Sequence, residues 1–224
     1  YNDKIELLTK AINLHSDNDN FFLNRANAYY EKKEYDKALA DYDEVIKLNE
    51  NNYLAYYHRN FVFNAQKKYD LAINDLQKTL ELNPSFKFAY NNLGWIANEL
   101  NEHDNAIKSY EHTLKLDPDN FIAYNGLAHS YRKKKMYDLA FENVYKSLEL
   151  NPQFGYAYST LAEIYSDNGN ENEFYRNTEL ALIFKTNIEE FLTEDAYKPF
   201  LNQDKFKTLL DKYEKTSTSP TMSP

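Results

Sequence analysis

The apolar residues of the chain return with a period of 34 residues, and each period contains two runs of helical spacing. In residues 87–120, Tyr90, Leu93, Gly94 and Ala97 lie at i, i+3, i+4 and i+7 and form one apolar stripe. A second stripe begins at Ala106. The pattern predicts two helices per period. Three series of positions carry the period: Ala38, Ala72, Ala106 and Ala140; Tyr56, Tyr90, Tyr124 and Tyr158; and Pro84, Pro118 and Pro152.

These recurring residues closely resemble the tetratricopeptide repeat, whose pattern is an aromatic residue, Leu-Gly or Leu-Ala, Tyr, Ala, a large apolar residue and Pro. One stretch fits it with Tyr124, Leu127-Ala128, Tyr131, Ala140 and Pro152. The resemblance covers residues 1–188. It implies an all-α fold, a right-handed superhelical solenoid of antiparallel helix pairs with about five repeats, a partial N-terminal repeat and C-terminal capping helices.

The repeat divides the chain into segments. Five units are predicted at residues 19–52, 53–86, 87–120, 121–154 and 155–188. Residues 1–18 match only the second helix of a preceding unit, which predicts that the solenoid continued upstream. Residues 189–215 are predicted to cap the last repeat, and the polar, proline-containing tail 216–224 to be disordered. The apolar residues of the predicted cap are Phe191, Phe200, Phe206, Leu209, Leu210 and Tyr213.

Four departures from the pattern mark places where the packing should differ. Arg25 and Arg59 stand where Leu is usual in the Leu-Gly pair. In the fifth unit, Phe174 replaces the recurring Ala and Thr186 replaces the closing Pro. The large residue at 174 predicts a change of stacking after residue 170.

Composition narrows the classes of function. The formal net charge of −9 disfavours nonspecific binding to nucleic acid or anionic lipid. No apolar run approaches the roughly 18 residues needed to span a membrane, so membrane insertion is not expected. The absence of cysteine excludes disulfides and thiolate chemistry within this sequence. Without a starting Met, targeting cannot be judged, and the compartment stays open with the cytoplasm slightly preferred.

The sequence predicts neither an enzyme nor a cofactor or metal site. The five histidines have no metal-ligand spacing, the four glycines form no phosphate-binding loop, and no serine lies in a G-x-S-x-G turn. Basic runs at 32–33, 67–68 and 132–135 each lie at the end of the predicted first helix of their repeat. Cations there complement the helix dipole, which is favoured over a set of phosphate sites.

Asparagines and aromatic residues share the face of the first helices that is opposite the apolar stripe. In the third unit, Phe88, Asn92 and Trp95 lie along one side of the helix. The resemblance implies that this face lines the concave groove of a solenoid, where an Asn side chain can pair with the backbone of an extended peptide. The candidate binding residues are Asn24, Asn27, Tyr57, His58, Phe61, Asn64, Asn91, Asn92, Trp95, Asn98, Asn125, His129 and Arg132. In the fifth unit the equivalent residues are Tyr156, Ser159, Thr160 and Glu163.

The groove does not match two better-defined binding modes. An asparagine ladder is only partial, because His58, Gly126 and Thr160 stand at ladder positions. A clamp for the carboxylate of chaperone tails is not predicted, since only Asn27 fits its pattern. Alternatively, Trp95 and Phe61 pack against neighbouring helices, and an Asn-rich chain places some asparagines on this face by chance.

We therefore expect a protein-interaction scaffold that binds an extended peptide or partner segment in the concave groove. A first alternative is an oligomerisation or assembly module that uses its ends or convex face, with self-association as its signature. A second is the regulatory arm of a larger enzyme or receptor. The partner itself is not named by the sequence.

Overall fold

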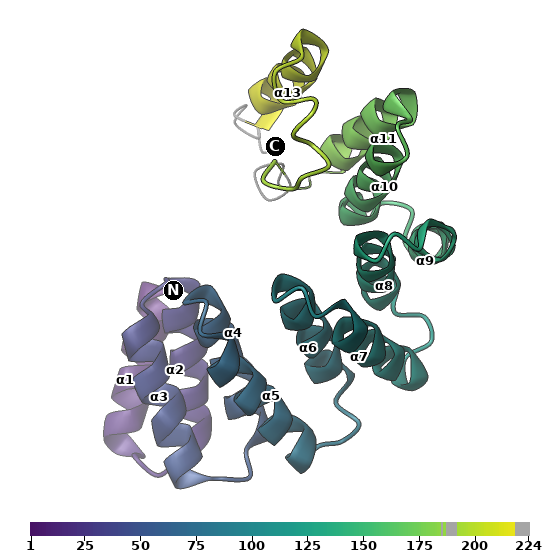
Figure 1. Cartoon of the computed structure of the whole chain (residues 1–224). Coiled ribbons are helices and arrows are strands. Elements are labelled where there is room, and N and C mark those ends of the chain that lie inside the picture. Colours follow the sequence, from purple (N-terminus) through teal and green to yellow (C-terminus); the bar gives the residue numbers. More distant parts are fainter. Residues whose placement is uncertain (185, 187–191, 218–224) are drawn as a thin grey trace. The chain divides into compact units, whose positions relative to one another are not determined.

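A computed structural model describes residues 1–184, 186 and 192–217, without the side chains of 214–217. These residues form twelve helices and no strand (Figure 1), which confirms the all-α prediction. The chain divides into an N-terminal unit, Tyr1–Glu102, and a C-terminal unit, His103–Pro224. Phe191 of the predicted cap and residues 218–224 of the predicted tail lie outside the described residues.

In the N-terminal unit each helix packs against the next along the chain. The small residue that recurs every 34 positions is fully buried at Ala38 and Ala72. Tyr42 and Val45 fill the space beside Ala38. The helices are α1 (Asn2–Leu14), α2 (Asp19–Glu31), α3 (Tyr35–Leu48), α4 (Tyr53–Ala65), α5 (Tyr69–Leu82) and α6 (Lys87–Glu99).

The C-terminal unit continues the same alternation and then departs from it. Ala128, Ala140 and Val144 form a core between neighbouring helices. Phe174, the large residue in place of alanine, is fully buried, and its ring stacks on that of Phe200 at a centroid distance of 3.7 Å. The helices are α7 (His103–Leu116), α8 (Phe121–Lys133), α9 (Tyr137–Leu150), α10 (Gly155–Asp167), α11 (Glu171–Ile183) and α13 (Asp204–Ser217).

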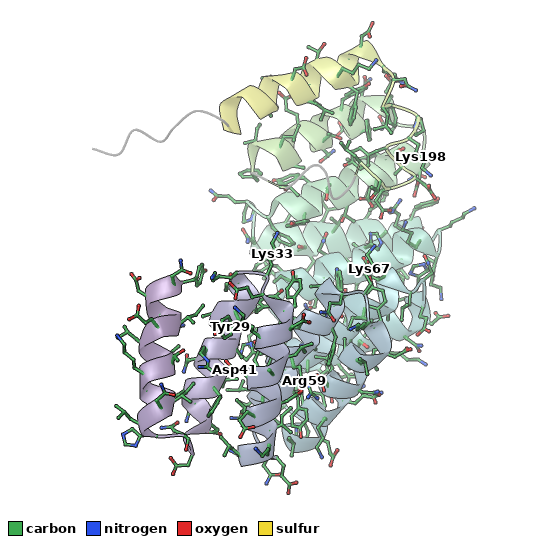
Figure 2. The ribbon with its side chains drawn as sticks, turned by 90° about the vertical axis from the view of Figure 1, so that its left-hand side faces the viewer. Tyr29, Lys33, Asp41, Arg59, Lys67 and Lys198 are labelled. Atoms are coloured by element: carbon green, nitrogen blue, oxygen red, sulfur yellow. The ribbon has the colours of Figure 1, made fainter. Side chains whose placement is uncertain are left out.

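Each first helix ends in the same left-handed turn. The residue after the C-cap has a positive φ at five positions 34 residues apart: Lys33 at 60°, Lys67 at 56°, Asn101 at 60°, Lys135 at 60° and Gly169 at 71°. At the first, Lys33 N–H donates to Tyr30 O at 2.8 Å and Glu34 N–H to Tyr29 O at 2.9 Å, which satisfies two carbonyls at the helix end. Figure 2 shows Lys33 and Lys67 at the corresponding ends of their helix pairs. The basic runs therefore lie at a demanding backbone position, which the dipole interpretation did not include.

The arginines at 25 and 59 are explained by ion pairs within the N-terminal unit. Arg25 of α2 donates to both carboxylate oxygens of Asp41 in α3, each at 2.7 Å. Arg59 of α4 pairs in the same way with Asp75 of α5, at 2.9 and 2.7 Å. Figure 2 labels Asp41 and Arg59, one member of each pair. A charged bidentate contact thus replaces the apolar Leu at this position.

Candidate functional site

The candidate residues of the N-terminal unit lie on α2, α4 and α6; we call their shared surface the N-terminal face. Its centre is a cluster of rings around Tyr57. The Tyr57 ring lies 5.2 Å from Phe61, 5.3 Å from His58 and 4.7 Å from Phe86, measured between centroids. Burial lowers the pKa of His58, so the imidazole is held in its neutral form. Tyr57 and Phe61 therefore contribute to the packing of the face as well as to its surface.

Trp95 of α6 differs from these rings because much of its side chain reaches solvent. Its exposure is 44%, and that of Phe88, about two turns earlier in the same helix, is 49%. A large aromatic side chain that stays this exposed is available to a partner.

The asparagines of the N-terminal face differ in how far they are committed to contacts within the fold. Asn27 accepts a hydrogen bond from the hydroxyl of Tyr42 at 2.6 Å. Asn64 Nδ2 donates to Asn60 Oδ1 at 3.1 Å, whereas Asn92 Nδ2 is buried without a hydrogen-bond partner among the described residues. Asn24 is exposed, although its Nδ2 donates to Asn20 O at 2.8 Å.

Two amide oxygens of this face, Asn64 Oδ1 and Asn91 Oδ1, are buried without a hydrogen-bond partner among the described residues. Asn98 completes the set on α6 as a half-buried side chain. A buried acceptor without a donor costs about 1–3 kcal/mol, so a donor that reaches these oxygens would be favoured.

In the C-terminal unit, the structure places Arg132, a predicted groove residue, inside a cluster of carboxylates. Arg132 of α8 is only 4% exposed. Its guanidinium lies 2.8 Å from Glu163 and 3.1 Å from Asp167 of α10, and 3.3 Å from Glu194. Lys133 also pairs with Glu194, at 2.6 Å. The reason is that the chain after α11 returns to α8 and brings a third carboxylate to this arginine.

The neighbouring candidates on α8 belong to the same surroundings. His129 Nδ1 lies 3.6 Å from a carboxylate oxygen of Glu163. Burial opposes the charge of Glu163, but Arg132 and His129 outweigh it and hold the pKa of that carboxyl below its usual value. Asn125 is half-buried, and its Oδ1 has no hydrogen-bond partner among the described residues.

The structure also gives the reason why residue 126 is not an asparagine. A Cβ atom at Gly126 would overlap the ring of Tyr110, which α7 places against α8. Any side chain at 126 would have to displace that buried ring. The gap in the predicted ladder is therefore a packing requirement.

Sequence reasoning missed the Arg–Asp pairs, although a signal for them is present. Arg25 and Arg59 are each followed 16 residues later by an aspartate, whereas Leu93, Leu127 and Leu161 are followed by Ser109, Asn143 and Asn177. A repeat with arginine at the first of these positions thus has aspartate at the second, and a repeat with leucine at the first has an uncharged residue at the second. Glu194 has no such signal, because it lies outside the repeated positions.

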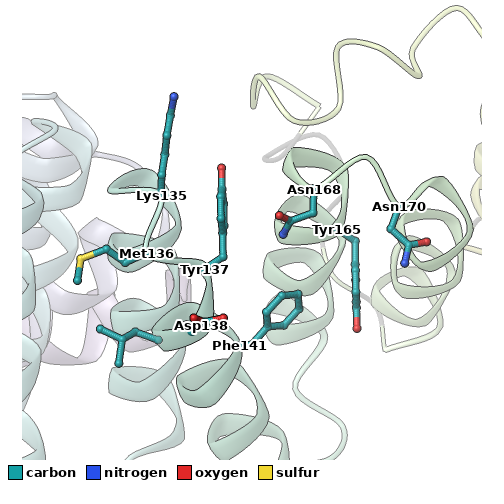
Figure 3. Close-up of a pocket in the computed structure, with 9 residues that line it drawn as sticks. Lys135, Met136, Tyr137, Asp138, Phe141, Tyr165, Asn168 and Asn170 are labelled. Atoms are coloured by element: carbon teal, nitrogen blue, oxygen red, sulfur yellow. The ribbon is translucent and has the colours of Figure 1, made fainter.

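An open pocket of about 650 Å³ lies beside the turn between α8 and α9, with Phe141 and Tyr165 among its walls (Figure 3). Those two rings are 5.1 Å apart. A smaller pocket of about 410 Å³ is lined by residues 33–37 and 66. Three repeat lengths later, the equivalent residues 135–139 and 168 line the first pocket. Both pockets therefore follow from the geometry of the repeat. Their lining residues do not indicate a particular ligand.

Two searches of the described residues bear on other classes of site. No helix in the described ranges has the length and apolar character needed to cross a membrane. Within the same residues, no group of three or more His, Asp or Glu side chains is placed to hold a metal ion.

Comparisons with known proteins agree with this fold. A family model described as the tetratricopeptide repeat protein 21 C-terminal ARM domain matches residues 1–158. No curated protein sequence matches the chain.

Three solved structures have the same fold at low identity, and they support the fold alone. PilW, a widely conserved type IV pilus biogenesis factor, is 20% identical over 91% of this chain and 95% of its own, with a TM-score of 0.73. YrrB, a TPR protein with an unusual peptide-binding site, is 21% identical over 81% of this chain and 93% of its own, with a TM-score of 0.62. MamA from Desulfovibrio magneticus RS-1 is 16% identical over 74% and 94%, with a TM-score of 0.65.

Proposed function

The chain belongs to the family of the tetratricopeptide repeat protein 21 C-terminal ARM domain, and on this premise we propose that it binds an extended segment of a protein partner on its N-terminal face. The fold is that of protein-interaction scaffolds in general. We propose both that the ligand is a peptide and that it binds on the N-terminal face. We also propose that residues 19–188 comprise five repeat units.

The observation that carries the proposal is the exposure of Trp95 on α6, on a face whose α4 residues include the ring cluster of Tyr57, His58 and Phe61. Binding energy at protein interfaces is concentrated in a few aromatic anchors, each of which contributes about 2 kcal/mol or more. Asparagine amides alone would be too weak, since four hydrogen bonds at about 1 kcal/mol each give only millimolar affinity. The face combines both kinds of contact, with Trp95 as the anchor.

The amides suit an extended backbone in particular. A peptide bond offers one donor and one acceptor, and a side-chain amide offers the complement of both. The buried oxygens of Asn64 and Asn91 add acceptors that a peptide N–H would satisfy. YrrB, which has a peptide-binding site of its own, supports this mode by likeness of fold.

We also propose that the chain has no catalytic activity. Helical repeat families of this kind are typically scaffolds without catalysis, and Arg132, Glu163 and Asp167 of the C-terminal unit are held in ion pairs with one another. The predicted absence of a chaperone-tail clamp is retained, because α4 presents His58 and α6 presents Phe88 and Asn92 at the clamp positions.

A selection from a peptide library tests the proposal, with the parent chain, Trp95→Ala and the control Leu71→Ala. Leu71 of α5 has a similar exposure, 45%, but does not belong to the N-terminal face. We expect peptides enriched on the parent and on Leu71→Ala to bind Trp95→Ala at least about tenfold more weakly. Equal binding to all three would contradict the proposal.

A second candidate function, assembly, is favoured by one observation on α1. Leu7 and Leu14 of this helix are 66% and 78% exposed. If no peptide is enriched, and the sedimentation coefficient of the parent chain rises with concentration but that of Leu14→Glu does not, assembly through α1 replaces peptide binding as the function.

A further inference from the structure

We propose that α8, α10 and α11 form a second peptide-binding site, specific for an acidic segment with an aromatic residue, and that residues 192–203 of this chain are its intramolecular occupant. An acidic segment of a partner would bind by displacing them. The site uses Arg132, Lys133 and Ser166, none of which lies on the N-terminal face. An experiment can therefore contradict this inference without contradicting the proposed function.

The first observation is the capture of one acidic side chain by two cations from a distant part of the sequence. Glu194 lies 3.3 Å from Arg132 and 2.6 Å from Lys133, which precede it by 62 and 61 residues. Its neighbour Asp195 has a side chain 84% exposed and pairs only locally, with Lys198. The cations of α8 thus select one of two adjacent carboxylates.

The second observation is that α10 holds the backbone of the same segment. Ser166 Oγ donates to Ala196 O at 2.6 Å. Within the segment, Tyr197 N–H donates to Glu194 O at 3.1 Å and Phe200 N–H to Tyr197 O at 2.9 Å, both three residues apart. The segment therefore consists of successive turns, and Figure 1 shows it passing beside α10 on its way to α13.

The third observation is a buried aromatic anchor next to these polar contacts. Tyr197 is fully buried, with its ring 5.2 Å from that of Phe174. A charged contact, a recognised backbone carbonyl and a buried ring are the components of a bound peptide. The occupant has the sequence Glu194-Asp195-Ala196-Tyr197. From it we infer that the site binds a carboxylate followed, three residues later, by an aromatic ring.

The charge of the cluster allows the carboxylate of Glu194 to exchange, although Ala196, Tyr197 and Phe200 of the same segment are buried and oppose its release. Arg132 and Lys133 face three carboxylates, Glu163, Asp167 and Glu194. When Glu194 departs, Arg132 keeps both partners on α10 and is not left unpaired. Glu194 is itself 29% exposed at its side chain, so little desolvation opposes its exchange for another carboxylate.

Because residues 192–203 are covalently attached to the chain, a competing peptide must overcome a high local concentration of the internal segment. A segment attached to the same chain acts at an effective concentration in the millimolar range. A free acidic peptide of equal intrinsic affinity therefore competes poorly with the intact chain, and weakening the internal contact should reveal its binding.

Fluorescence anisotropy with a labelled peptide of residues 192–203, LTEDAYKPFLNQ, tests the inference on the full chain. The proteins are the parent, Glu194→Ala and the matched control Asp195→Ala. We expect Glu194→Ala to bind the peptide about tenfold more tightly than the other two, because the internal competitor has lost a charged hydrogen bond. A peptide with alanine at the position of Glu194 should lose this binding.

Hydrogen exchange supplies a second measurement that separates a displaceable occupant from a permanent cap. In Glu194→Ala, amides of residues 196–203 should exchange faster while those of α10 keep their protection. Equal peptide affinity for all three proteins, no binding to Glu194→Ala at millimolar peptide, or faster exchange that extends through α10 would each overturn the inference.

Discussion

At the scale of single residues, the chain tolerates backbone strain in order to repeat the same turn. Lys33, Lys67 and Lys135 adopt a left-handed conformation, which costs an L-residue roughly 1–2 kcal/mol relative to the right-handed one. Asn101 and Gly169 occupy the equivalent positions of two other turns. These are the residue types that accept this conformation most readily.

Replacing Lys67 by glycine should therefore stabilise the protein. We expect Lys67→Gly to raise the free energy of unfolding by about 0.5–1 kcal/mol, the relief of strain being partly offset by the greater freedom of glycine in the unfolded chain. Urea denaturation gives the measurement. Gln66→Gly is the control, because Gln66 has φ −90° and gains nothing from glycine; if both variants are destabilised, strain at residue 67 is not significant.

At the scale of helices, the pairs Arg25–Asp41 and Arg59–Asp75 join the two helices of one pair and also reach the preceding second helix. Arg25 donates to Thr9 of α1 at 3.0 Å, and Arg59 to Asp43 of α3 at 2.6 Å. Each arginine thus contacts three consecutive elements of the N-terminal unit. The same position is leucine at 93, 127 and 161, so two kinds of contact serve one place in the repeat.

The pair at 59 and 75 should be replaceable only as a unit. Arg59→Ala leaves the carboxylate of Asp75, 6% exposed, without its partner; we expect a loss of about 3 kcal/mol. The double variant Arg59→Leu/Asp75→Asn copies residues 127 and 143 and should lie within about 1 kcal/mol of the parent. Both values come from urea denaturation. A double variant no more stable than Arg59→Ala would show that the arginine contributes chiefly through Asp43 or its aliphatic contacts.

Elements were predictable from sequence to the extent that their signals are local. The apolar spacing of residues 87–99 and the recurring Ala106 are sufficient to place α6 and α7. The left-handed turn was not predicted, because lysine at 33, 67 and 135 does not indicate a positive φ, whereas glycine would have done so. Gly126 was treated as a gap in a ladder, since the ring of Tyr110 that requires it belongs to another helix.

At the scale of the whole molecule, two half-buried histidines make stability depend on pH. Burial lowers the pKa of His58, and burial together with nearby cationic groups lowers that of His103. A histidine whose folded-state pKa lies below its unfolded value takes up its proton on unfolding. Its contribution to stability is present above the unfolded pKa of about 6.5 and is lost as the pH falls below it.

The free energy of unfolding should accordingly fall between pH 7.5 and pH 5.5. In His58→Gln the fall should be smaller, because one of the two groups that take up a proton on unfolding has been removed. Urea midpoints at the two pH values give the comparison. The same fall in parent and variant would show that His58 is not the group responsible.

The sequence by itself determined the helical repeat, because the period of 34 and the apolar spacing within it are properties of neighbouring residues. It also placed Trp95 opposite the apolar stripe, since the geometry of one helix fixes which residues share a face. The tertiary structure decided which polar side chains remain available. Arg132 lies on a predicted binding face, yet Glu163 and Asp167 of α10 pair with it, and so does Glu194, 62 residues later. That outcome depends on where the chain turns back after α11, which no local pattern encodes.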